Sequence, residues 1–245
     1  MLRIGMLTPS SNTVLEPVTN AMLAGVPGIS AHFSRFKVTE IALDPSALAQ
    51  FDDSEILRAA ELLAHAKVDV IAWNGTSASW LGIERDRALA QRITAATGIR
   101  ASTCILALVD ILERIGATSQ AVVSPYTDDV QEKIIATFAA AGIACPAERH
   151  LRIRDNFAFG TISEEVIAGL IAEVAAAAPD VVTVLCTNMN GARVATEAET
   201  KEGPLMLDSV AVTLWGCLMA AGVSVELLAP WGRLFRDPRL TARAS

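Results

Sequence analysis

The segment Asp180–Asn188, DVVTVLCTN, decides the fold of this 245-residue chain. Its run of apolar and β-branched residues predicts a buried parallel strand, and the thiol of Cys186 and two polar residues follow at the carboxyl end of that strand. A related segment, DVIAWNGT, occupies Asp69–Thr76, and a constant offset of 111 residues aligns Gly75 with Cys186. We therefore predict two copies of one unit, of which one carries a thiol at this strand end.

Two further matches support the repeat. Pro125 and Tyr126 follow one predicted strand as Pro9 and Ser10 follow another, at an offset of 116. Residues 103–116 and 209–222 then align end to end at an offset of 106. The fold class we predict is α/β, with two pseudo-symmetric Rossmann-like domains, each a parallel sheet flanked by helices. We expect residues 1–116 with the tail 223–245 to form the first half and residues 117–222 the second.

Strands and helices alternate along the whole chain. The expected strands are 3–8, 29–36, 68–73, 98–102, 119–124, a strand opening at 143–145, 181–185 and 204–207. The expected helices are 13–24, 54–66, 84–97, 104–115, 127–141, 163–177, 190–200 and 209–222. Thr13 and Glu16 have the spacing of a capping box, which predicts the start of the first helix. Loops at 43–45 and 151–161 are placed to cover a site.

Composition excludes several classes of function. The net charge of −7 offers no basic field for phosphate backbones, and one Tyr and four Trp leave few rings for stacking on bases. The four cysteines form no CxxC pair and lie beside no histidine at zinc-ligand spacing, so we expect no metal site and no disulfide framework. The absence of a signal peptide pattern and of a long apolar run predicts a cytoplasmic protein without a membrane segment.

Parallel sheets bind ligands beyond the carboxyl ends of their strands. In a pseudo-twofold pair these ends can face one another, so we expect the active site in the cleft between the halves. The candidate residues follow four strands: Pro9, Ser10, Ser11 and Asn12; Trp73, Gly75, Thr76 and Ser77; Pro125, Tyr126 and Thr127; Cys186, Thr187 and Asn188.

These groups favour carbanion chemistry beside a carboxylate, without any cofactor. Hydroxyls and helix N-terminal amides can bind a carboxylate and the negative charge that spreads onto it when an α-carbanion forms. A strand-end cysteine such as Cys186 can exchange a proton with that carbon. We expect the other cysteines, Cys104, Cys145 and Cys217, to be small buried side chains without a catalytic role.

Three motifs together resemble a known family. GTSAS at 75–79, PYTDDV at 125–130 and the strand-end Cys186 resemble the aspartate/glutamate racemase superfamily, particularly its arylmalonate decarboxylase and maleate cis-trans isomerase branches. The resemblance extends to about Asp237. Racemases and maleate isomerases of that superfamily carry one cysteine per half, whereas Gly75 stands at the first position here. Arylmalonate decarboxylases share the single cysteine and the tyrosine after the middle strand.

The resemblance implies a mechanism. Thr76, Ser77 and Tyr126, with backbone amides near Thr187, would bind the carboxylate that the substrate retains. The departing carboxylate would sit in an apolar pocket, for which the candidates are Trp73, Leu43, Phe157 and Phe159, although loop packing is the favoured interpretation of the two phenylalanines. Cys186 would then protonate the enediolate on one face, and the product would be a single enantiomer.

PSSNT at 9–13 favours a second interpretation. It resembles the maleate isomerase motif, whose asparagine contacts a substrate carboxylate, so Asn12 is a candidate ligand for a second carboxylate. That mechanism needs the first cysteine as a nucleophile, which Gly75 cannot provide. The alternatives are therefore a decarboxylase of a substituted malonate, an isomerase or racemase of a small carboxylate, and a binding protein without turnover. Each has a small mono- or dicarboxylate as its partner, and the chain is a monomer or a homo-oligomer.

Overall fold

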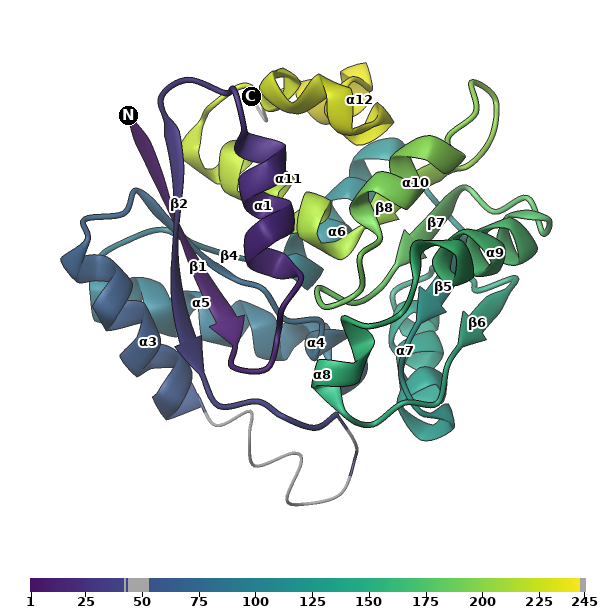
Figure 1. Ribbon diagram of the computed structural model, residues 1–245, viewed down its shortest axis with the longest axis horizontal. Coiled ribbons are helices and arrows are strands. Elements are labelled where there is room, and N and C mark those ends of the chain that lie inside the picture. The colour runs from purple at the N-terminus through teal and green to yellow at the C-terminus, as the bar shows by residue number, and fades with distance from the viewer. Residues whose placement is uncertain (42, 44–52, 243–245) are drawn as a thin grey trace.

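Two parallel four-stranded sheets organise the chain (Figure 1). The computed structural model describes residues 1–41, 43 and 53–242. The first sheet contains β1 (Leu2–Pro9), β2 (Ile29–Phe36), β3 (Val70–Trp73) and β4 (Ala101–Thr103); the second contains β5 (Gln120–Ser124), β6 (Glu148–His150), β7 (Val181–Val184) and β8 (Leu205–Asp208). Their orders are β2-β1-β3-β4 and β6-β5-β7-β8. Because the two orders correspond strand for strand, the predicted fold class is confirmed.

Helices flank both sheets. In the first half they are α1 (Leu15–Leu23), α3 (Asp53–His65), α4 (Ala78–Leu81), α5 (Ile83–Thr97) and α6 (Cys104–Ile115). They continue as α7 (Asp128–Ala140), α8 (Asn156–Phe159), α9 (Glu164–Ala175), α10 (Ala192–Ala198) and α11 (Ser209–Ala221), and the tail holds η2 (Val225–Trp231), η3 (Arg233–Phe235) and α12 (Pro238–Thr241). Helices α3 and α5 contact the first sheet, and α9 contacts the second. Strands β3 and β7 are buried along their whole length, as expected of strands covered on both faces.

Helices α6 and α11 occupy equivalent positions in the two halves. Each follows the last strand of its sheet and ends at a glycine, Gly116 or Gly222, with φ of 68°. This left-handed conformation suits glycine, which carries no Cβ. The two helices contact each other, and α11 also packs against β3 and β4 of the first sheet. The predicted division of the chain near Gly116 stays a prediction.

Three local predictions were wrong. Helix α1 does not begin with a capping box, since the Asn12 side-chain oxygen accepts the N–H groups of Val14 and Leu15 at 3.0 and 2.9 Å, and Glu16 pairs with Arg35. The strand expected at 143–145 makes a single bridge through Ala144, and regular pairing begins later, at β6. The loop 151–161 contains the short helix α8. Of the loop at 43–45, residues 44 and 45 lie outside the described residues.

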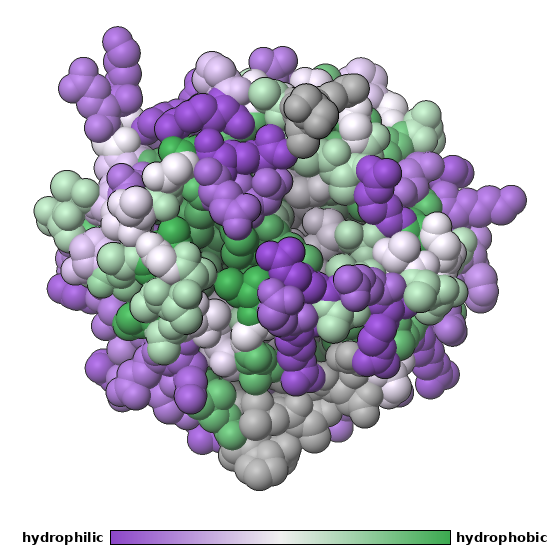
Figure 2. Space-filling view, turned by 180° about the vertical axis from the view of Figure 1, so that it is seen from behind, coloured by the Kyte–Doolittle hydropathy of each residue, from purple (hydrophilic) through white to green (hydrophobic). Residues whose placement is uncertain are grey.

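The surface is mixed in character. Seen from behind, hydrophilic and hydrophobic residues lie side by side, with an apolar area left of the centre (Figure 2). Among the described residues, no helix combines the length and the apolar character that crossing a lipid bilayer requires.

Candidate active site

The ends of β3, β5 and β7 bring the predicted site residues together. The hydroxyls of Thr76 and Tyr126 are hydrogen-bonded at 2.6 Å. On the other side of Gly75, the Thr187 hydroxyl donates to the backbone oxygen of Asn74 at 2.9 Å. Gly75 thus lies between two contacts with the second half, and both partners, Tyr126 and Thr187, are neighbours of Cys186. The predicted juxtaposition of the two strand ends follows from these bonds.

Cys186 is a buried thiol. Its side chain is 3% exposed, and the backbone N–H of Asn188 donates to Sγ at 3.3 Å. Burial raises the pKa of Cys186 to about 12, although the Asn188 amide and the Tyr126 hydroxyl partly oppose this effect. At neutral pH the sulfur therefore carries its proton, which is the state that a proton donor needs.

Tyr126 is also held in its neutral form. Burial, followed by the nearby Cys186, raises the pKa of its phenol well above the usual value. Its ring packs against Trp80, with centroids 5.1 Å apart, and edge-on against Phe159 at 5.6 Å. The hydroxyl therefore keeps its proton and is held in place at the boundary between the two sheets.

Asn12 and Asn188 connect the two halves. Asn12 donates to the backbone and side-chain oxygens of Thr187 at 3.1 and 3.2 Å. The side-chain oxygen of Asn188 accepts the N–H groups of Thr13 and Val14 at 2.9 and 3.2 Å, near the start of α1. Both asparagines are 1% exposed. Their observed contacts are between protein groups, and their substrate-binding role stays a prediction.

Asn156 completes this network, although no motif in the sequence pointed to it. Its amide donates to the Ser11 hydroxyl at 2.7 Å, and its backbone oxygen accepts from the Asn188 side chain. It lies in the segment expected to be an irregular loop, so its position beside the strand ends followed from no periodicity. Its contacts position the residues that surround Cys186.

Ser10 and Ser11 hold the loop after β1. Both hydroxyls donate to the backbone oxygen of Val38, at 3.3 and 2.6 Å. The Arg35 guanidinium donates to the backbone oxygens of Ser10 and Asn12 at 2.9 Å each. A role for either serine in substrate binding stays a prediction. Pro9, the last residue of β1, and Ser77, directly before α4, are both buried.

Asp208 is a buried carboxyl that the sequence analysis did not select. It is 2% exposed at the end of β8, where Oδ1 accepts the N–H groups of Val210 and Ala211 at 2.8 and 3.1 Å. Burial raises the pKa of Asp208 to about 7, and its negative charge contributes to the raised pKa of Cys186. Its position at a strand end, next to the strand that carries the thiol, was the signal that could have identified it.

The apolar candidates differ in position. Trp73 is 1% exposed and packs against Phe36 with ring centroids 5.2 Å apart. Phe159 is fully buried against Tyr126, whereas Phe157 is 53% exposed. Leu43 is partly buried against the core. A lining role for Phe157 is thus wrong, because its position in α8 turns it toward solvent.

Two carboxylic acids, Asp86 and Asp208, are the buried ionisable groups other than Cys and Tyr among the described residues. Within the part of the chain that the structure describes, the buried polar residues include no Lys, Arg or His. The same residues contain no cluster of three His, Cys, Asp or Glu side chains that could hold a metal ion. Hydroxyls, amides and backbone N–H groups are therefore the donors that an anionic ligand would meet here.

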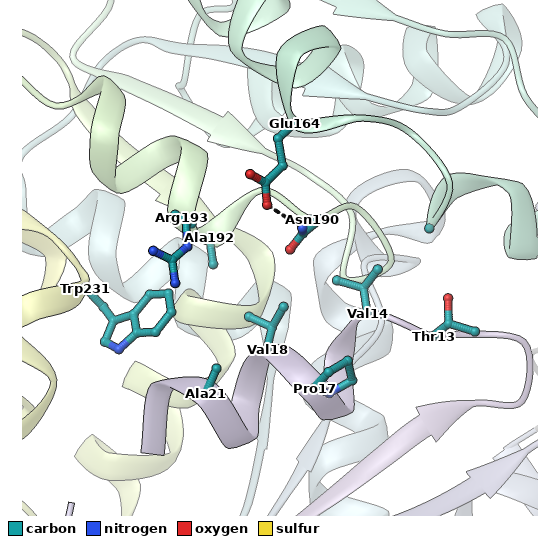
Figure 3. Close-up of a pocket in the computed structure, with 11 residues that line it drawn as sticks. Thr13, Val14, Pro17, Val18, Ala21, Glu164, Asn190, Ala192, Arg193 and Trp231 are labelled. Atoms are coloured by element: carbon teal, nitrogen blue, oxygen red, sulfur yellow. Dashed lines mark hydrogen bonds between the residues drawn. The ribbon is translucent and has the colours of Figure 1, made fainter. Parts of the chain in front are cut away.

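A separate cavity of about 320 Å³ lies between α1 and α10 (Figure 3). Val14, Val18 and Ala21 of the α1 region face Trp231, whose ring lies 5.9 Å from the Arg193 guanidinium carbon. Neither Cys186, Thr76 nor Tyr126 lines this cavity. It is therefore distinct from the strand-end site.

Comparisons with known proteins agree with this geometry. A curated maleate isomerase of Pseudomonas putida is 27% identical, over 94% of this chain and 95% of the relative. The arylmalonate decarboxylase of Bordetella bronchiseptica is 24% identical, over 96% of each chain. Among solved structures, the maleate cis-trans isomerase of Nocardia farcinica, bound to Tris, aligns with a TM-score of 0.85 at 25% identity, over 97% of this chain and 98% of that one.

An unliganded arylmalonate decarboxylase structure, which is 23% identical, has the same fold, with a TM-score of 0.79 over 97% of this chain and 100% of that one. The resemblance expected from the sequence motifs is confirmed. The arylmalonate decarboxylase family matches residues 4–235, nearly the whole length, and the chain therefore belongs to that family.

Proposed function

We propose that this protein is a cofactor-independent decarboxylase of a small substituted malonate, and that Cys186 protonates the enediolate that remains after CO2 leaves. The observation that carries the proposal is the position of one buried thiol, Cys186, beside the hydroxyl of Tyr126 and across the strand ends from Gly75. A protonated thiol can donate to a carbanion, whereas addition to a double bond requires a thiolate. The state of Cys186 therefore favours proton transfer over nucleophilic attack.

The retained carboxylate would bind to the hydroxyls of Thr76 and Tyr126. They bond to each other in the unliganded site, so each could turn its proton toward a substrate oxygen. The phenol stays neutral because burial raises its pKa, and it can therefore donate throughout the physiological range. Neutral donors of this kind stabilise the charge that moves onto the carboxylate as the enediolate forms.

The departing carboxylate would face apolar rings. Trp73 and Phe159 are both buried, and a carboxylate beside them loses hydration that neutral CO2 does not need. The bond between the α-carbon and this carboxylate breaks, and its electron pair passes to the retained carboxylate as an enediolate. The Sγ proton of Cys186 then moves to the α-carbon, and the thiolate recovers a proton from solvent. With a donor on one face, the product is a single enantiomer.

A maleate isomerase is the second candidate. The PSSNT motif at 9–13 favours it, and so do relatives named maleate isomerase. In that reaction Asn12 would bind the second carboxylate of the substrate, and Cys186 would work with water or with another non-thiol group. Asn12 would first have to release Thr187, to which it donates two hydrogen bonds. A carboxylate-binding protein without turnover is the third candidate.

One assay separates these candidates. The protein is incubated in D2O with a panel of small dicarboxylates, while CO2 release, ultraviolet loss of a conjugated double bond and α-deuteration are recorded. We expect CO2 release with deuterium on one face. Conversion of a cis double bond into the trans isomer without CO2 release, seen as a change in ultraviolet absorbance, would identify an isomerase, and exchange of an α-proton without CO2 release would identify a racemase. Binding without any conversion would identify the third candidate.

The thiol is tested by Cys186→Ala. We expect the rate of CO2 release to fall roughly 100-fold or more, because a positioned general acid contributes a factor of that order. The matched control is Cys145→Ala, since this partly buried thiol lies outside the site and its loss should leave the rate within about twofold of the wild-type value. Full activity in the Cys186→Ala variant would exclude the mechanism.

A further inference from the structure

Large and small residues exchange places between the two halves of the site. The offset of 111 residues that aligns Gly75 with Cys186 also aligns Trp73 with Val184. Both pairs lie at the ends of central strands. Strand β3 lies between β1 and β4, and β7 lies between β5 and β8. In the second half the small Val184 therefore stands two residues before Cys186, and in the first half the large Trp73 stands two residues before Gly75.

The Trp73 indole occupies the direction in which a side chain at position 75 would project. A Cβ built on Gly75 would lie 1.8 Å from Cζ2 of the indole, 2.2 Å from Cε2 and 2.5 Å from Cη2. These separations are far shorter than any non-bonded contact between carbon atoms. Since Trp73 is 1% exposed and packs against Phe36, its ring has little room to withdraw.

This position lies on the wall that faces Cys186. The residues on either side of Gly75 reach the second half, Asn74 through Thr187 and Thr76 through Tyr126. Tyr126 and Asn188 in turn contact the thiol of Cys186. The indole therefore fills the place that corresponds, in the first half, to the sulfur in the second.

We propose that Trp73 determines which residue position 75 can hold: its ring excludes a side chain there, and the face opposite Cys186 is thereby kept without a proton donor. The effect on the stereochemistry of the product rests on the proposed function. The exclusion of a side chain at position 75 depends on packing alone. It follows that a thiol can be introduced at position 75 only when position 73 is also reduced in size. The second half has valine two residues before cysteine, and the double variant Trp73→Val with Gly75→Cys copies this arrangement in the first half.

The experiment compares Gly75→Cys, Trp73→Val and the double variant by thermal unfolding. In the wild-type background, Trp73→Val removes a buried ring and should lower the unfolding midpoint. In the Gly75→Cys background, the same change removes the overlap and should raise the midpoint by roughly 5 °C or more. If Trp73→Val lowers the midpoint equally in both backgrounds, the proposal is overturned.

Two further variants serve as controls for this double-mutant comparison. Trp215→Val also removes a fully buried indole, and it should lower the midpoint in both backgrounds because no overlap is relieved. If Gly75→Cys does not fold, Gly75→Ala takes its place, since the overlap already arises from Cβ. These measurements need no turnover, so they test Trp73 even if the wild-type protein releases no CO2 and the proposed function fails.

The chemical consequence has its own readout. An enantiopure decarboxylation product is incubated with each variant in D2O, and loss of enantiomeric excess is followed with α-deuteration. The double variant should racemise this product at least about tenfold faster than Gly75→Cys alone, because only it has room for thiols on both faces. Equal racemisation by Gly75→Cys alone would overturn the assignment of Trp73.

Discussion

The state of one sulfur distinguishes the possible mechanisms at the scale of single residues. Cys186 is buried and its pKa is raised to about 12, so at pH 8 only a very small fraction is thiolate. Cys145 is partly exposed, and its pKa is raised as well, mainly by burial. A thiol that acts as a proton donor is thus protected from the reagents that attack thiolates.

We therefore expect selective alkylation of the chain. With iodoacetamide at pH 8, Cys145 should be modified before Cys186, and the labelling of Cys186 should increase with pH up to its high pKa. Peptide mass spectrometry after timed quenching measures both rates, and Cys104 and Cys217, which are fully buried, report on any unfolding. Faster labelling of Cys186 than of Cys145 at pH 7 would indicate a thiolate and would favour the nucleophilic mechanism.

At the scale of elements, Asp208 makes the stability of α11 depend on pH. Its carboxyl caps the helix, and burial raises its pKa from the usual 3.8 to about 7. Between these two values the folded protein holds a proton that the unfolded chain releases. The contribution of Asp208 to the free energy of unfolding is therefore full at low pH and is lost as pH rises through about 7, by up to roughly 4 kcal/mol.

Asp208→Asn should remove this dependence. The variant keeps a side-chain oxygen for the amides of Val210 and Ala211, so its free energy of unfolding, measured with urea from pH 4.5 to 8, should fall less steeply with pH than that of the wild type. Asp180→Asn is the control, because it removes a carboxyl that does not titrate in this range. Hydrogen bonds from Thr118 and Ser119 lower the pKa of Asp180 below the usual 3.8, so its contribution is lost only at lower pH and Asp180→Asn should leave the slope between pH 4.5 and 8 unchanged. An unchanged slope in Asp208→Asn would contradict the buried, titrating carboxyl.

Element prediction from the sequence succeeded where a pattern was repeated. Strand β2 and helix α6 have the predicted bounds: apolar and polar residues largely alternate along the strand, and Gly116 marks the end of the helix. The start of α1 was predicted wrongly, since Asn12 supplies the cap that Thr13 was expected to provide. Local spacing identifies residues that can cap a helix, but tertiary contacts decide which of them does so.

At the scale of the whole molecule, the sequence predicted the opposition of the two strand ends but not what fills the space between them. The constant offset placed Gly75 across from Cys186, and the hydrogen bonds of Thr76 and Thr187 agree with that placement. The offset carries no information on side-chain volume, so the position of the Trp73 ring was not foreseen. The role of Asn156 was not predicted for a related reason, since its partner Ser11 lies far away in the sequence.

The junction between the halves leads to a final prediction. The Asn188 side chain belongs to the second half and accepts the backbone N–H groups of Thr13 and Val14, in the first half and near the start of α1. Asn188→Ala would leave the N–H group of Thr13 and the buried backbone oxygen of Asn156 without this partner, whereas the N–H group of Val14 would keep the side-chain oxygen of Asn12 as its acceptor. We expect the free energy of unfolding to fall by about 1 to 2 kcal/mol, because the backbone oxygen of Asn156 is buried and would lose its donor.

Urea unfolding measures this loss. Asn190→Ala is the matched control, because Asn190 bonds to the exposed Glu164 and its removal should change the free energy by no more than about 0.5 kcal/mol. Asn188→Asp keeps the acceptor and should retain part of the stability lost in Asn188→Ala. Equal stability of Asn188→Ala and wild type would mean that the two halves are held together without this contact, and Asn188 would then be free to bind a substrate carboxylate instead.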